Sequence, residues 1–102
     1  MNEIITTRRE QVIELCRKYH VRRLSVFGSV LRDDFNAESS DIDFVVEFES
    51  TADLGLRGDY FDLEEELTRL FSRKVDLVSW EGVRNPYFKR ELERSQELLY
   101  AA

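Results

Sequence analysis

Hydrophobic positions recur at two different spacings along the chain, which predicts both helices and strands. The three- and four-residue spacing of one buried helix face predicts helices over residues 7–19, 59–72 and about 85–99. Thr7 followed by Glu10 fits a capping box at the start of the first helix. Asn85 followed by Pro86 fits an N-cap and a first helical position at the start of the last one.

Between these helices, β-branched and aromatic residues form segments that are typical of strands. They predict strands over residues 21–27, 41–48 and 74–80. In the second strand Ile42, Phe44 and Val46 share one face, which we expect to be buried. A short helical turn is expected at 29–32 and a polar loop at 33–40. The fold class is therefore α/β (α+β): a small mixed β-sheet with helices packed on it.

Length and composition limit what such a fold can be. The chain has 102 residues, of which 42% are hydrophobic and 35% charged, so we expect a single domain over residues 1–102. No apolar run approaches the roughly 18 residues of a membrane span. The first residues lack the apolar segment of a signal peptide. We therefore expect a cytoplasmic protein with no membrane partner.

The net charge of −6 disfavours direct nucleic-acid binding, which depends on phosphate neutralisation by Lys and Arg. Basic residues gather in 8–32 and acidic ones in 47–66, a division that suits a protein partner or a small anionic ligand. The single cysteine, Cys16, excludes an internal disulfide and a cysteine-based zinc cluster. Its place in an amphipathic helix predicts a buried, structural thiol.

Chemistry is concentrated in three aspartates on predicted strands. Asp41 and Asp43 stand two apart, so their carboxylates project from the same face and repel one another unless cations neutralise them. Oxygen ligands of this kind, combined with substrate phosphates, suit Mg²⁺. Asp76 interrupts the apolar residues of the third strand and is expected on the same sheet face if the strands are neighbours.

Gly28 and Ser29 follow directly where the first strand ends and a helical turn begins. Glycine permits close backbone approach, and free N–H groups at such a turn, with the serine hydroxyl, can bind phosphate. These parts predict a triphosphate site beside two metal ions, with in-line displacement at the α-phosphate and release of pyrophosphate. Asp76 would take the proton of the acceptor hydroxyl or complete the metal coordination. Arg32 could reach a phosphate or pair with Asp33 or Asp34.

The segments 26–32 and 40–48 together resemble the minimal nucleotidyltransferases of the polymerase β superfamily. Residues 74–78 are similar to that family's third-carboxylate strand, and 84–87 to the start of its terminal helix. The resemblance implies the fold of that superfamily, ATP as substrate and Mg²⁺, with two ions expected. It implies phosphate binding by Gly28 and Ser29 and metal binding by a catalytic triad. The candidate residues are Asp41, Asp43 and Asp76 for catalysis and metal, and Gly28, Ser29, Ser40 and Arg32 for the nucleotide.

Family members of this size resemble antitoxins that act on a small helical HEPN ribonuclease toxin. The resemblance implies transfer of AMP to a tyrosine of that toxin, which neutralises it, within a hetero-oligomer. A chain of this length has no room for an acceptor domain of its own, which favours an acceptor on another protein. Two alternatives stay open: a degenerate nucleotidyltransferase that neutralises its toxin by binding alone, and transfer to a small molecule. Asp33 and an eleven-residue gap between Ser29 and Asp41, one longer than the family pattern, motivate the first of these.

Overall fold

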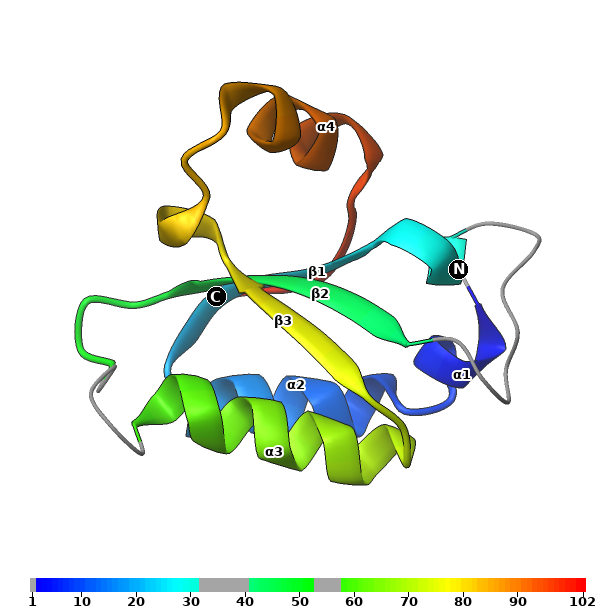
Figure 1. Cartoon of the computed structure of the whole chain (residues 1–102). Helices are drawn as coiled ribbons and strands as arrows, with labels where there is room; N and C mark the ends of the chain where they lie inside the picture. The colour runs from blue at the N-terminus through cyan, green and yellow to red at the C-terminus, as the bar shows by residue number, and fades with distance from the viewer. Residues whose placement is uncertain (1, 32–40, 53–57) are drawn as a thin grey trace.

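The chain forms a four-stranded mixed sheet with helices on both of its faces (Figure 1). The computed structural model describes residues 2–31, 41–52 and 58–102. The elements follow in the order α1 (Glu3–Thr6), α2 (Arg9–Lys18), β1 (Val21–Phe27), η1 (Gly28–Leu31), β2 (Ile42–Phe48), α3 (Asp59–Phe71), β3 (Val75–Ser79), η2 (Trp80–Gly82), α4 (Pro86–Ser95) and β4 (Glu97–Ala101). The predicted fold class, a small mixed sheet with packed helices, is confirmed.

The strands lie in the order β3-β2-β1-β4. Strand β1 is antiparallel to both of its neighbours, whereas β2 and β3 are parallel. A parallel pair needs a crossover connection, and α3 provides it between β2 and β3. As a result, β2 and β3 present their first residues at the same end of the sheet.

Helices α2 and α3 cover one face of the sheet and build the core with it (Figure 1). Alternate residues of β2 point into this layer, and the ring of Phe44 lies 5.8 Å from that of Phe71, centroid to centroid. Cys16 of α2 is fully buried there, as predicted, and burial raises the pKa of its thiol to about 12. The fully buried side chains include Ile5, Val12, Cys16, Leu24, Val26, Ile42, Phe44, Val46, Leu63 and Leu67.

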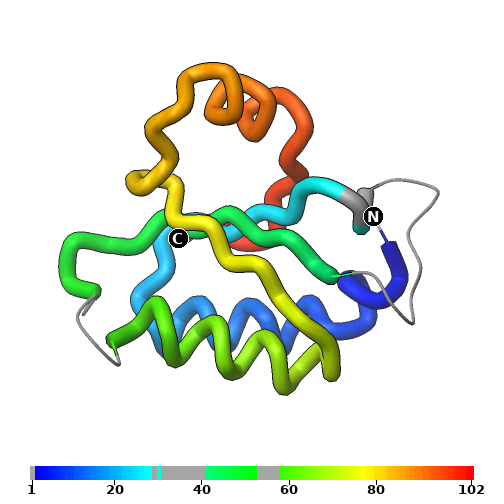
Figure 2. Tube along the Cα trace, viewed as in Figure 1, coloured from blue at the N-terminus to red at the C-terminus, as the bar shows by residue number. Residues whose placement is uncertain are grey.

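Helix α4 stands on the opposite face of the sheet. Its N-cap is Asn85, whose side chain accepts hydrogen bonds from the backbone N–H groups of Tyr87 and Phe88, as the Asn-Pro start predicts. Leu92 is the buried residue of this helix. Figure 2 shows the chain leaving the sheet after β3, passing through α4 and returning to the sheet as its last strand.

The prediction that the last helix runs to about Leu99 is wrong. Helix α4 ends at Ser95, Gln96 is extended with φ −69° and ψ 148°, and the following residues pair with β1 as β4. Leu99 is 2% exposed and Leu98 is 48% exposed, an alternation with the period of a strand. If the helix continued to Leu99, the backbone N–H and C=O groups along this edge of β1 would have no strand to pair with. Residues 97–101 therefore form a strand and not a further part of the helix.

The N-terminal helix also differs from the prediction. Helix α2 begins at Arg9, and the short helix α1 precedes it. The Thr7 hydroxyl donates to the carbonyl of Glu3, at 2.8 Å, so it closes α1 and does not cap α2. The side chain of Asn2 caps α1 by accepting from the N–H of Ile4 at 2.9 Å. This small helix buries Ile5 completely.

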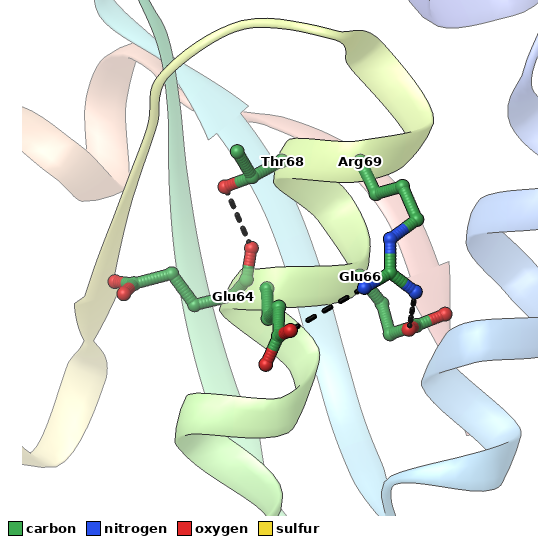
Figure 3. Close-up of polar contacts among 5 residues, drawn as sticks. Glu64, Glu66, Thr68 and Arg69 are labelled. Atoms are coloured by element: carbon green, nitrogen blue, oxygen red, sulfur yellow. Dashed lines mark hydrogen bonds and ion pairs between the residues drawn. The ribbon is translucent and has the colours of Figure 1, made fainter.

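Charged residues of α3 form contacts within their own helix on its solvent side. Arg69 lies 3.0 Å from a carboxylate oxygen of Glu66 and 3.3 Å from one of Glu65, and the Thr68 hydroxyl donates to the carbonyl of Glu64 (Figure 3). Ion pairs this exposed contribute little to stability.

Of the helices within the described ranges, α3 included, none has the length and apolar character needed to cross a bilayer.

Candidate active site

A row of three residues crosses the sheet on the face opposite α2 and α3. Phe27 of β1 is paired with Asp43 of β2, and Asp43 is paired with Asp76 of β3. Residues paired across neighbouring strands point to the same face, so both carboxylates project away from the core. Asp43 is half-buried and Asp76 is exposed. The expectation that Asp76 shares the sheet face of Asp43 is confirmed.

Asp41 directly precedes β2, two residues before Asp43, and its side chain is 43% exposed. The N–H of Ile42 donates to the carbonyl of Lys74 at 3.2 Å, which holds the start of β2 against the residue before β3. The Lys74 ammonium lies 3.9 Å from a carboxylate oxygen of Asp41. This cation offsets part of the negative charge that the aspartate pair gathers at this end of the sheet.

Gly28 lies against the carboxylate of Asp43. Its φ is +74°, in the left-handed region that favours glycine. A Cβ at this position would lie 2.4 Å from Oδ2 and 3.3 Å from Cγ of Asp43. Only a residue without a side chain therefore allows both the turn into η1 and the observed place of the carboxylate. The predicted phosphate turn and the predicted metal ligand are in direct contact.

The other predicted nucleotide-binding residues lie beyond what the structure describes. Arg32, Ser40 and Asp33 belong to residues 32–40, outside the described ranges. Ser29 is described as part of the backbone of η1, but its side chain is not. The residues that the structure brings together are thus Gly28, Asp41 and Asp43, with Asp76 on the adjacent strand.

The donor chemistry of this site fits Mg²⁺ held jointly with a substrate. Among residues 2–31, 41–52 and 58–102, no three His, Cys, Asp or Glu side chains converge closely enough to hold a metal ion by themselves. Mg²⁺ is usually bound through one or two carboxylates together with water and substrate phosphates, and not in a closed protein cage. Asp41 and Asp43 could supply the carboxylates, and Gly28 leaves room for phosphates to approach them.

Two aromatic residues border the carboxylate row and were not predicted as part of the site. The ring of Phe88, from α4, meets that of Phe27 edge-on, with 6.2 Å between centroids and an interplanar angle of 70°. The hydroxyl of Tyr60, from α3, donates to the carbonyl of Leu77 on the outer edge of β3. Burial, followed by the carboxylates of Glu64 and Asp76, raises the pKa of Tyr60. No local pattern could reveal these contacts, because they depend on how α3 and α4 pack.

The fold and this arrangement of carboxylates define a nucleotidyltransferase of the polymerase β type. The family model described as polymerase beta, nucleotidyltransferase, matches residues 10–102. The chain belongs to this family, and the resemblance drawn from its motifs is confirmed. The matched range contains Gly28 and all three aspartates.

Individual relatives agree with this assignment. A Methanocaldococcus jannaschii protein provisionally named a protein adenylyltransferase is 42% identical over 86 residues, which is 84% of this chain and 82% of that protein. A solved structure provisionally described as a minimal nucleotidyltransferase has a TM-score of 0.77 and 35% identity, covering 95% of both chains. A complex of a tri-AMPylated Shewanella oneidensis HEPN toxin with an MNT antitoxin contains a chain with a TM-score of 0.67. The two chains are 19% identical, and the match covers 95% of this chain and 72% of the other, which shows that they share a fold.

Proposed function

We propose that this protein is an antitoxin that transfers AMP from ATP to a tyrosine hydroxyl of a HEPN-type ribonuclease toxin. The observation that carries the proposal is the contact of Gly28 with Asp43, next to Asp41 and in register with Asp76. It is supported by the name of the M. jannaschii relative, a protein adenylyltransferase, and by the Shewanella complex, which pairs an MNT antitoxin with an AMPylated HEPN toxin. On this proposal the protein works in the cytoplasm, in a hetero-oligomer with its toxin.

The residues of the site divide the reaction between them. Asp41 and Asp43 would hold Mg²⁺, with two ions expected, and the backbone at Gly28 and Ser29 would bind the phosphates of ATP. Bound Mg²⁺ would neutralise the phosphates and make the α-phosphorus easier to attack. Asp76 accepts the proton of the tyrosine hydroxyl. A bond forms between the tyrosine oxygen and the α-phosphorus, the bond from that phosphorus to the oxygen bridging to the β-phosphate breaks, and pyrophosphate leaves.

The test is transfer of label from α-labelled ATP to the co-purified HEPN partner. Asp41→Asn should abolish transfer and leave the fold unchanged, because the amide keeps the shape of the side chain and removes the charge that binds the ion. Glu65→Gln is the matched control. It makes the same change on the outer side of α3, where Glu65 is 69% exposed and paired with Arg69, and transfer should persist. Transfer by Asp41→Asn at the wild-type rate would overturn the proposal.

A second candidate function is neutralisation of the toxin by binding alone. It is motivated by Asp33 and by the eleven-residue gap between Ser29 and Asp41, which is one residue longer than the family pattern. The double variant Asp41→Asn/Asp43→Asn separates the two functions. Loss of toxin neutralisation in cells that express both proteins supports catalysis, whereas full neutralisation supports binding alone.

A further inference from the structure

A cavity of about 380 Å³ lies along the outer edge of β3, between that strand and the segment that leads into α4. Its walls include Val78 of β3, Val83 of the connecting segment, Phe88 of α4 and Tyr60 of α3. The volume falls within the range of about 300–1,000 Å³ that is usual for ligand sites. The remaining lining residues include the polar Ser79, Arg84 and Asn85, and a lining that combines aromatic and polar groups suits a flat ring that carries a hydroxyl.

The cavity lies near Asp76, because Leu77 and Val78, the next two residues of β3, line it. Val78 follows Asp76 by two residues and therefore points to the same face of β3. Phe88 contacts the cavity on one side and Phe27, the first member of the row, on the other. Tyr60 lies close enough to Asp76 to be influenced by its charge. The cavity and the row are therefore neighbours on the β3 side of the sheet.

The order of the strands places this cavity on the side of the attacking group. In an in-line displacement, the entering oxygen and the leaving pyrophosphate lie on opposite sides of the α-phosphorus. The predicted pyrophosphate position is at Gly28, after β1, and the ion-binding aspartates belong to β2. Moving in the same direction across the sheet leads to Asp76 on β3 and then to the cavity.

We propose that the cavity along β3 receives the aromatic side chain of the acceptor tyrosine and presents its hydroxyl to Asp76. The proposal rests on the proposed function, since it assigns the acceptor site of that same reaction. Val78, Val83 and Phe88 pack against the phenol ring, so these residues determine which acceptor is used. The adenine ring of ATP is the rival occupant, and kinetics distinguish the two because each substrate has its own KM.

Phe88→Ala is the principal variant. It should raise the KM for the HEPN partner about tenfold, through the lost ring contact, and change the KM for ATP less than about twofold. Phe61→Ala is the matched control. Phe61 is 50% exposed, compared with 40% for Phe88, and does not line the cavity, so neither KM should change. A rise in the KM for ATP alone, or no change in either KM, would overturn the assignment.

A binding measurement keeps this test independent of catalysis. N-acetyl-tyrosinamide, added to the isotope-labelled protein, should shift the NMR signals of Val78 and Val83 in the wild type and in Phe61→Ala. It should not shift them in Phe88→Ala or in Val78→Phe, which fills the cavity. If the signals of the wild type do not shift, the cavity is not the acceptor site, even where AMP transfer is observed. Shifted signals without AMP transfer to any partner would support the site and instead count against the proposed function.

Discussion

Replacing Gly28 with alanine tests the contact between the phosphate turn and Asp43. Alanine in the left-handed conformation, φ +74°, costs about 1–2 kcal/mol. The new Cβ would lie 2.4 Å from Oδ2 of Asp43, so the carboxylate has to retreat by about 1 Å to reach ordinary van der Waals contact. A side chain forced away from its rotamer costs about 0.5–1.5 kcal/mol. We therefore expect the free energy of unfolding to fall by about 2–3 kcal/mol.

Activity should respond more strongly than stability. A displacement of about 1 Å at a catalytic group can lower the rate about 100-fold, so AMP transfer should fall by about that factor at a temperature where the variant stays folded. Urea denaturation followed by circular dichroism measures the change in stability, and label transfer from α-labelled ATP measures the rate. The thermal midpoint should fall by about 10–20 °C for a chain of this size.

Gly82→Ala is the matched control for this substitution. Its Cβ would meet the Cβ of Ser79 at 3.7 Å, an ordinary contact, and Gly82 does not have a positive φ. Its stability should change by less than about 1 kcal/mol. In an Asp43→Ala background there is no carboxylate to displace, so Gly28→Ala should cost only its backbone part, about 1–2 kcal/mol. An equal cost in both backgrounds would refute the reasoning that Asp43 requires a glycine at position 28.

Three further predictions concern the fold. Leu99→Ala should lower the free energy of unfolding by about 2–5 kcal/mol because Leu99 is 2% exposed, whereas Leu98→Ala, at a position 48% exposed, should cost much less in the same urea titration. Asn85→Ala should cost about 1 kcal/mol in a thermal melt, since two backbone N–H groups of α4 lose their acceptor. Folding raises the pKa of the Cys16 thiol from 9.0 to about 12, so the free energy of unfolding should be unaffected by this group below pH 9 and should fall as the pH rises from 9 towards 12. Urea titrations at several pH values measure this decline, and Cys16→Ala should remove the part that the thiol causes.

The sequence predicted the central strands and their chemistry well because alternation acts over short distances. In β2, buried Ile42 and Phe44 flank Asp43, and this alternation alone assigns the aspartate to the opposite face. Asp76 was expected on the sheet face of Asp43 if the two strands are neighbours, and the structure pairs these two residues directly. Asn85 marks the start of α4 because an N-cap is a local interaction.

What the sequence could not predict depends on distant parts of the chain. Leu98, Leu99 and Tyr100 follow Leu92 at a spacing that fits a helix, and only the open edge of β1 decides in favour of a strand. The need for glycine at position 28 comes partly from a carboxylate fifteen positions later in the chain, which no local pattern records. From the sequence, Phe88 is one of the apolar residues of an amphipathic helix. Its contact with Phe27 depends on how α4 packs on the sheet.

The connection between the two edge strands, which contains α4, has a minimum span set by the sheet. Strands β3 and β4 form opposite edges of the sheet, so the segment between them must span its whole width. Three strand spacings of about 4.8 Å amount to roughly 14 Å, and a ten-residue helix is about 15 Å long. The helix is thus about as long as the sheet is wide. The amino acids on its outer surface can vary widely, but a connection much shorter than this width could not join β3 to β4 across the sheet.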